Sequence, residues 1–513
     1  MNEIQADKNN FAPRVGFAWQ PNLGLLGNRF REGRTVIRGG FGIAYDPLFF
    51  NIVSNTITNA PFVARGSFIQ TPGAAGSVTF PFLPTTVAEL ATTPSTAGGD
   101  PRLFSRVDVD PNLYNPYSMQ WNFGAQQELF RNGVLEVRYV GTRVVGQFQS
   151  INANPRTDFL NAAGEYLGLG AGAFTGGAIG QTRASTNANG RLDPNFGLIQ
   201  RRINGASSTY HGMQVRFDTR LRRNFTANVN YTLSRAIDNA SEVFSTLAGG
   251  QTVAISQNPF DANRGERGLS AFNQTHTFSS NFVMELPWMR DQRGFVGHAL
   301  GGWQMNGIVL AGSGRPYTAA EFFGRYDPLF TGSLRPFNGN PNAPEGTIAF
   351  GSFAAENLLG RTGVPAGQFV VFNTRQTGTQ GQVVTAQEAL QSARLVYNDF
   401  GLVPAFGLTA ASFPDLEAFN LFRTPFGDVG RNTFLGEPQF TVNFGLFKTT
   451  NISEAVRLEF RAEAFNLLNH RNFGVPDPVT EDAFTGFNVG SFQNPGYNEG
   501  DRRQLRFGLR LLF

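Results

Sequence analysis

The last ten residues of the chain, Gln504 to Phe513, alternate between apolar and polar side chains. A strict two-residue period of this length predicts a β-strand with one apolar face and one face in contact with water. The unpaired edge groups of such a strand need neighbours, so it should belong to a larger sheet. Its apolar face would carry Leu505, Phe507, Leu509, Leu511 and Phe513, and its polar face Gln504, Arg506, Gly508 and Arg510, with Leu512 as the exception.

The segment just upstream repeats this design. Its apolar positions are Val456, Leu458, Phe460, Ala462 and Ala464, and its charged positions are Arg457, Glu459, Arg461 and Glu463. Four charges in register cannot lie unpaired in a dry core. We therefore predict that this ladder, with Arg506 and Arg510 of the last strand, faces a water-filled lumen, while Leu505, Phe507, Leu509 and Leu511 face an apolar solvent.

Alternation recurs along the whole chain and predicts about eleven strands. Turn signals such as Arg131-Asn132-Gly133 join neighbouring strands as hairpins. In the longest link, the Thr385 and Glu388 capping-box pattern predicts one sizeable helix near 385–396. The expected strands are about 13–20, 34–46, 118–130, 133–143, 208–222, 224–236, 273–287, 300–311, 437–448, 454–468 and 503–513.

The links between these strands alternate strictly in length. Short links follow Trp19, Leu129, Leu221, Leu286 and Lys448, and long links follow Tyr45, Thr142, Ala236, Ala311 and Leu468. In an up-and-down antiparallel sheet all long links then lie on one edge, with Phe513 on the other. Outer-membrane barrels have this asymmetry, with short periplasmic turns and long outer loops. A soluble sandwich has no reason to sort its loops in this way. The fold class indicated is all-β, an antiparallel up-and-down transmembrane β-barrel.

Composition agrees with a barrel and excludes several other classes. Charged residues make up only 16% of the chain, the net charge is +4 and the arginines are scattered, so nucleic-acid binding is not indicated. Cys 0 excludes disulfides and thiolate metal sites. No apolar run approaches the roughly 18 residues of a membrane helix, and the polar start does not resemble a secretory signal. Interfacial aromatic positions are expected at strand ends; the candidates are Trp19, Trp121, Trp288 and Trp303.

Candidate chemistry along the chain is weak, so the sequence predicts no catalytic, cofactor or metal site and no enzyme. The motif Asp108-Val109-Asp110 fits turn chemistry in a Pro/Asn loop, with a Ca²⁺ site as the alternative. The glycine-rich run 168–172 lacks the Lys of a phosphate-binding loop. Ser313 lacks a plausible His and acid pair. No histidine lies at ligand spacing with another histidine or a carboxylate; they are His211, His276, His298 and His470.

Several phrases resemble the barrel of Oar-like TonB-dependent receptors. Their order and spacing run from about residue 10 to the end, and the densest is Phe460-Arg-Ala-Glu-Ala-Phe-Asn-Leu-Leu-Asn-His470. A terminal Phe, here Phe513, is typical of proteins inserted by the outer-membrane assembly machinery. The other phrases are Asn10–Phe17, Arg38–Asp46, Asn115–Asn122, Tyr139–Gly141, Phe272–His276, Gly302–Gln304, Gly314–Tyr317, Gly430–Asn432 and Asn472–Phe473.

The resemblance implies an outer-membrane receptor that binds and imports an unidentified solute with energy relayed by TonB. Members of that family carry a signal peptide, a TonB-contacting segment and a plug domain, none of which this sequence contains. Their barrels have about 22 strands, so this chain would be about half of one. We expect a curved, open sheet, or a barrel with a poor seam, and a largely unpaired outer edge on 504–513. The alternatives are a structural or adhesive outer-membrane barrel and a passive porin. The implied partners are outer-membrane lipid, a plug domain, TonB and the assembly machinery.

Overall fold

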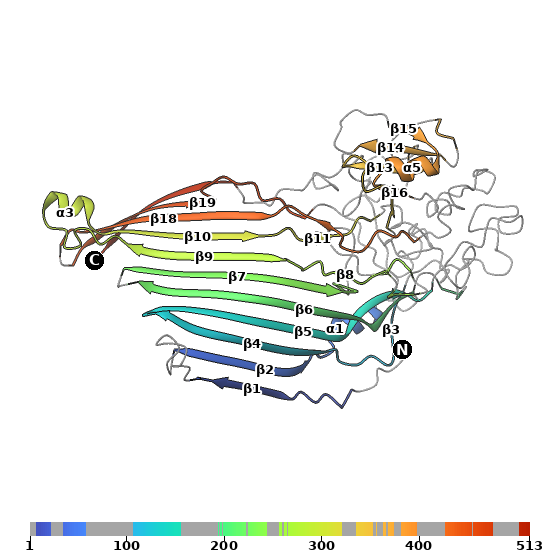
Figure 1. The fold of residues 1–513 in the computed structure, drawn as a ribbon, viewed down its shortest axis with the longest axis horizontal. Coiled ribbons are helices and arrows are strands. Elements are labelled where there is room, and N and C mark those ends of the chain that lie inside the picture. The colour runs from blue at the N-terminus through green and yellow to red at the C-terminus, as the bar shows by residue number, and fades with distance from the viewer. Residues whose placement is uncertain are drawn as a thin grey trace, which may run out of the picture.

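The computed structural model describes residues 7–21, 34–57, 106–154, 193, 195–196, 199–221, 224–243, 256–258, 261–263, 265–320, 335–351, 355, 363–365, 368–373, 381–397, 426–453, 455–475 and 502–513. Figure 1 shows one long curved sheet with a small second sheet beside its right-hand end. Among these residues no helix is both long enough and apolar enough to cross a membrane.

The main sheet has an eleven-strand path in which successive strands are antiparallel neighbours. This confirms the predicted fold class of an all-β, up-and-down antiparallel sheet. The strands are β1 (Arg14–Trp19), β2 (Thr35–Tyr45), β4 (Tyr117–Phe130), β5 (Gly133–Asn152), β6 (Ile199–Leu221), β7 (Phe225–Asp238), β9 (His276–Glu285), β10 (Trp303–Gly312), β18 (Gln439–Asn451), β19 (Arg457–Phe465) and β20 (Gln504–Leu512).

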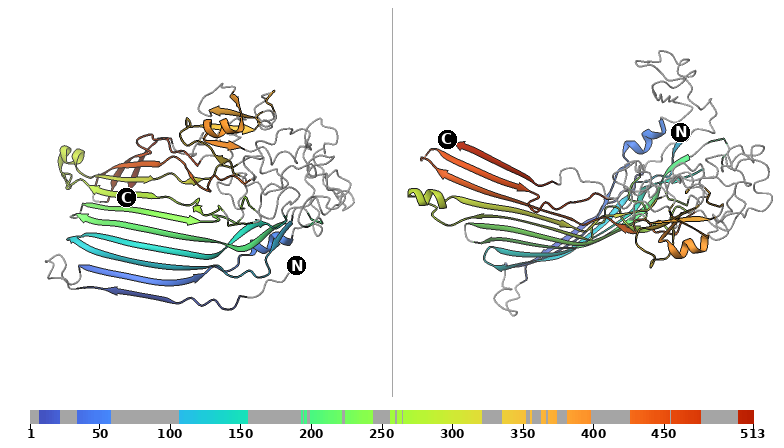
Figure 2. Two further views of the ribbon diagram at one scale, coloured as in Figure 1. Left: turned by 45° about the vertical axis from the view of Figure 1, so that its right-hand side comes forward. Right: turned by 90° about the horizontal axis from the view of Figure 1, so that it is seen from above.

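The sheet is open, as predicted. Among the described residues β1 pairs only with β2, and β20 pairs only with β19, so no ladder joins 504–513 to 11–20. Figure 2 shows the two end strands apart on a curved sheet. Because the path has an odd number of strands, its first and last strands run in the same direction.

The antiparallel order also fixes the two edges of the sheet. The strand ends at Tyr45, Asn152, Asp238, Gly312 and Phe465 all lie on one edge, here called the loop edge. Phe513 lies on the opposite, short-turn edge, as Figure 1 shows. The segments 47–117 and 313–436 therefore begin and end on the same edge, in agreement with the predicted topology.

Two strands are longer than the sequence indicated. We expected a loop over 144–208, but residues 144–152 continue β5 and residues 199–207 begin β6. The two extensions pair with each other through irregularities near Val145 and Gln147, and β3 (Arg106–Val109) adds a parallel strand to β6. A buried cluster of Ile52, Val109, Leu113 and Phe148 holds this end together. The short helix α1 (Phe50–Ile57), which was not expected, contributes Ile52.

The longest link contains a separate five-stranded sheet, here called the inserted sheet. The predicted capping box is confirmed at Thr385 and Glu388, and it begins helix α5 (Ala386–Ser392). The helix ends before 396 because the next residues form a strand. The strands are β12 (Phe337–Asn338), β13 (Thr347–Gly351), β14 (Phe369–Asn373), β15 (Gln382–Val384) and β16 (Leu395–Tyr397).

Four further short elements border these sheets. The pair β11 (Pro316–Tyr317) and β17 (Phe434–Leu435) joins the two ends of the longest link. Strand β8 (Gly268–Leu269) extends the pairing of β7 at the loop edge. Helix α3 (Gly294–Leu300), also unexpected, lies in the link between β9 and β10 on the short-turn edge.

Candidate functional site

Cross-strand register sorts the alternating residues of β19 and β20 onto two faces, because directly paired residues share a face. Leu505, Phe507, Leu509 and Leu511 pair with Ala464, Ala462, Phe460 and Leu458, while Arg506 and Arg510 pair with Glu463 and Glu459. Phe507 is 69% exposed and Leu509 is 70% exposed. The predicted apolar set therefore lies together on one exposed face, and the predicted charged set lies on the other.

The charged ladder lies at the surface, where Arg457 is exposed and Glu459, Arg461 and Glu463 are half-buried. Arg461 contacts Glu459 along the strand, and the Arg461 guanidinium lies 5.4 Å from the ring centre of Phe447 on β18. Arg457 is paired in register with Leu512, the one apolar residue on this side of β20. Ion pairs at a surface in contact with water contribute at most about 1 kcal/mol each. The ladder is thus better understood as a polar wall than as a source of stability.

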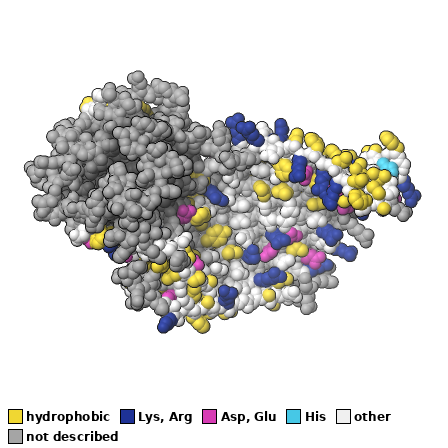
Figure 3. Space-filling view, turned by 180° about the vertical axis from the view of Figure 1, so that it is seen from behind, with side chains coloured by type: hydrophobic (Ala, Val, Ile, Leu, Met, Phe, Trp, Pro, Cys, Tyr) yellow, Lys and Arg dark blue, Asp and Glu magenta, His cyan; other side chains and the backbone are white. Residues whose placement is uncertain are grey.

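The same polar face continues across the sheet. Arg138 donates to Gln214 Oε1 at 2.8 Å, and Arg216 pairs with Asp218 at 2.6 Å. Seen from behind the view of Figure 1, charged side chains gather over the middle of the sheet (Figure 3). Register places on this face Gln126, Glu136, Arg138, Gln214, Arg216, Asp218, Asn228, Asn230, Asn281 and Asn306.

The four tryptophans lie toward both ends of the strands. Trp19 ends β1 and Trp303 begins β10 on the short-turn edge, where Trp288 is also exposed in the link after β9. Trp121 is the fifth residue of β4 and lies toward the loop edge. Phe513, the candidate assembly signal, is almost fully exposed at the short-turn edge.

Histidines on the apolar face form pairs that the sequence did not predict. Tyr139 Oη lies 2.6 Å from His211 Nδ1, and Tyr231 Oη lies 2.8 Å from His276 Nδ1. Each pair joins neighbouring strands toward the loop edge, where an aromatic ring with a polar tip suits a membrane interface. Within the described ranges no cluster of His, Asp and Glu could hold a metal ion.

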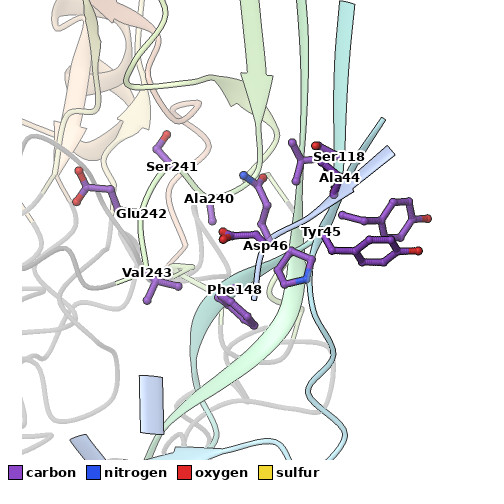
Figure 4. A pocket seen from close by; sticks show the side chains of 13 residues that line it. Ala44, Tyr45, Asp46, Ser118, Phe148, Ala240, Ser241, Glu242 and Val243 are labelled. Carbon is purple, nitrogen blue, oxygen red and sulfur yellow. Dashed lines mark hydrogen bonds between the residues drawn. The ribbon is translucent and has the colours of Figure 1, made fainter. Parts of the chain in front are cut away.

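A cavity of about 370 Å³ opens at the loop edge, between the ends of β2, β4 and β5 and the segment after β7 (Figure 4). Asp46 and Tyr45 point to opposite sides of β2, so Asp46 shares the polar side with Ser118. Asp46 and Glu242 are exposed and form no ion pair with any described residue. The buried Oε1 atom of Gln147 also has no hydrogen-bond partner among the residues that the structure describes. The described lining thus offers acceptors and contains no basic side chain.

Two buried ion pairs join the end of β7 and the segment between β7 and β9 to the longest link, and one of them adjoins the cavity wall. Arg431 pairs with Asp238, and its guanidinium also donates to Ser241 Oγ at 3.0 Å, next to Glu242 in the cavity wall. Arg335 pairs with Glu266 at 3.0 Å. All four charged side chains are 5% exposed or less.

Tyr317, which lies at the start of the longest link, is also buried, and its burial changes the pKa of its hydroxyl group. Burial, and then the nearby charge of Glu437, raise the pKa of Tyr317 to about 12. The hydroxyl group therefore stays neutral at any physiological pH.

Neither the ion pairs nor the cavity could be predicted from spacing in the sequence, because their residues come from distant segments.

Comparison with solved structures returns outer-membrane proteins. The outer membrane transporter YddB from Escherichia coli is 12% identical with a TM-score of 0.42, and the match covers 98% of this chain and 40% of that one. The ferripyoverdine receptor of the outer membrane of Pseudomonas aeruginosa is 8% identical with a TM-score of 0.36, covering 98% and 33%. The FrpB iron transporter from Neisseria meningitidis is 8% identical with a TM-score of 0.35, covering 98% and 39%. This chain thus spans 40% or less of their lengths.

No curated protein matches the sequence. The family described as outer membrane beta barrel domain, in contrast, matches residues 2–506, which is nearly the whole chain. That match agrees with the antiparallel strands, the two-faced sheet and the sorting of long links to one edge. The chain belongs to the outer membrane beta barrel domain family, and the outer membrane is where it resides.

Proposed function

We propose that this chain forms about half of the barrel of a TonB-dependent, Oar-like receptor, and that the complete protein binds and imports a solute. The observation that carries the proposal is the polar face, which runs over the described strands from the loop edge to the short-turn edge. In this proposal Arg457, Glu459, Arg461, Glu463, Arg506 and Arg510 face the lumen, and Leu505, Phe507, Leu509 and Leu511 face lipid. The phrases that resemble Oar-like receptors support the finer assignment.

The loop-edge cavity is the proposed site of first contact with the solute. It opens on the polar side of β2, next to a wall fixed by the Arg431 pair. Asp46, Glu242 and the unpartnered Gln147 Oε1 would accept hydrogen bonds, so a solute with donor groups suits the lining best. The plug domain and TonB would act on such a solute from the periplasmic side, and Phe513 would guide assembly. No catalytic step is proposed.

Two other outer-membrane functions share most of this architecture. A passive porin would use the same polar wall, and a structural or adhesive barrel would use the same loops. The two alternatives differ from a TonB-dependent receptor in their use of energy, because a porin needs none and an adhesive barrel imports nothing. Energy dependence therefore separates all three functions.

The test uses the complete receptor gene in cells and a panel of labelled cationic, neutral and anionic solutes. We expect uptake of at least one solute, lost when a protonophore dissipates the proton-motive force. Uptake that persists without energy would support the porin instead, and absence of uptake with intact surface display would support the adhesive barrel. Within this test, Asp46→Asn with Glu242→Gln should weaken solute binding, whereas Asp291→Asn on the short-turn edge is the matched control.

A further inference from the structure

The link between β9 and β10, residues 287–301, presents an apolar surface on the short-turn edge. Phe295 is 88% exposed and Trp288 is 62% exposed, and Met289, Val296 and Leu300 are exposed beside them. On helix α3, Phe295, Val296, Ala299 and Leu300 lie on one side at helical spacing. Gly297 on the opposite side is buried against the backbone of Gln292. The helix therefore turns its apolar side outward.

This link is held rigidly, so its exposed apolar side chains have a fixed placement. Gln292 donates to the carbonyl oxygen of Thr449 at 2.7 Å and accepts from the Asn451 amide at 2.9 Å. Trp303 Nε1 donates to the carbonyl oxygen of Ala299 at 3.0 Å. Lys448 donates to the carbonyl oxygen of Gly301. These bonds fasten α3 to the first residues of β10 and to the end of β18.

Trp303 and Lys448 show which face of the sheet the link adjoins. They are paired in register, and both share a face with Met305, Leu446 and Phe460. That is the apolar face of the sheet, because Phe460 in turn pairs with Leu509. The apolar side of α3 therefore continues the membrane-contacting face at its short-turn edge.

Other occupants of this surface are disfavoured by its place in the sheet. β9 and β10 each have a neighbour on both sides, so the link is not at either open edge. A domain inside the lumen would meet the polar face, which is the opposite one.

We propose that residues 288–300 form an interfacial anchor that inserts Trp288, Phe295 and Val296 into the inner leaflet, with the exposed Arg293 at the phosphate level. The inference rests on residence in the outer membrane and not on solute import.

The absence of cysteine makes a direct test possible, since a single introduced cysteine can carry a nitroxide label. The full chain is reconstituted in vesicles of phosphatidylethanolamine and phosphatidylglycerol, and the label is placed at Phe295→Cys. Leu509→Cys on the apolar face gives the value for lipid, and Phe272→Cys at the loop edge gives the value for water. The label at 295 is compared only in preparations in which the accessibilities measured at Leu509→Cys and Phe272→Cys differ. Such a difference also shows that the sheet has inserted into the vesicle membrane.

We expect the label at 295 to be more accessible to dissolved oxygen than to a water-soluble nickel complex, close to the Leu509→Cys value. Accessibility close to the Phe272→Cys value would overturn the anchor, because the link would then lie in water. Shielding from both reagents would also overturn it, because a protein surface would then cover the helix. Val296→Cys repeats the measurement on the same side, should the first variant disturb α3.

Discussion

The main sheet and the inserted sheet place similar apolar side chains in opposite positions. On β20, Phe507 and Leu509 are more than two-thirds exposed, whereas on β13, Ile348 and Phe350 are each 1% exposed. The inserted sheet buries its apolar residues on both faces, against α5 on one side and against Tyr317 and Val429 on the other. The main sheet has no second layer over its apolar face among the described elements. We propose that lipid covers this face.

This difference shows that the surrounding solvent, and not composition, decides where apolar residues lie. In water, a sheet must bury them against another layer. In the membrane, a barrel turns them outward and keeps polar side chains for the lumen. One chain satisfies both rules because the inserted sheet begins and ends at the loop edge, outside the strands that cross the membrane.

The largest expected effect comes from the buried ion pair that joins the two regions. Arg431→Ala leaves the carboxylate of Asp238 buried without its partner and removes the bonds to Ser241 and to the Glu266 carbonyl. We expect a loss of about 3–5 kcal/mol, seen as faster hydrogen exchange in 238–266 and 335–397. The matched control is Arg216→Ala, which removes an exposed pair with Asp218 and should cost less than about 1 kcal/mol. Equal effects of the two variants would show that water reaches the Arg431–Asp238 pair.

A second test compares one substitution in the two sheets. Phe350→Ala removes a ring stacked on Tyr397 at 4.9 Å and leaves a cavity, so it should cost about 3–5 kcal/mol. Phe507→Ala should cost clearly less, because lipid fills the vacated space. Urea unfolding of the chain in vesicles, followed by hydrogen exchange in each region, measures both values. If Phe507→Ala proved as costly as Phe350→Ala, β20 would lie under a protein layer.

The fold of the main sheet could be predicted because a strand with different solvents on its two faces must alternate. Residues 504–513 show this most clearly, and β20 spans Gln504–Leu512. The inserted sheet could not be predicted in the same way. All five residues of β13 are buried, since both of its faces are covered, so no two-residue period remains. The extensions of β5 and β6 were hidden by irregular pairing and by Gly146, whose φ is +73°.

The candidate site was less predictable than the fold because its contacts join distant residues. Asp238 and Arg431 are 193 positions apart, and no periodicity relates them. A partial signal existed, since Arg431 lies in the Gly430–Asn432 phrase that resembles Oar-like receptors. The phrase Phe460–His470, which also resembles Oar-like receptors, likewise contains residues with a structural role. Asn466, at φ +47°, accepts from the His470 amide and closes the turn after β19.

A third prediction tests the two faces of the main sheet. Phe507→Arg places a charge in the middle of β20 on the apolar face, and a lipid-facing charge costs about 2–4 kcal/mol at the bilayer midplane. Ile308→Arg is the matched control, because Ile308 is also exposed and mid-strand but lies on the polar face. It should change stability by less than about 0.5 kcal/mol. Urea titration in vesicles gives both values, and a costly Ile308→Arg with a neutral Phe507→Arg would reverse the assignment of the faces.

The smallest expected effect is a pH dependence confined to the inserted sheet. The Thr385 amide, and then the Thr385 hydroxyl, donate to the Glu388 carboxylate and hold its pKa below the usual 4.5. Because the folded pKa is the lower one, this stabilisation is present above pH 4.5 and is lost as the pH falls through the folded value. Hydrogen exchange of 385–392 should therefore accelerate as the pH is lowered from 5 to 3, after correction for intrinsic exchange. Glu388→Gln keeps an acceptor for the cap but carries no charge, so its corrected exchange should not change over this range. If the variant and the native chain respond alike, the acid sensitivity of α5 comes from another group.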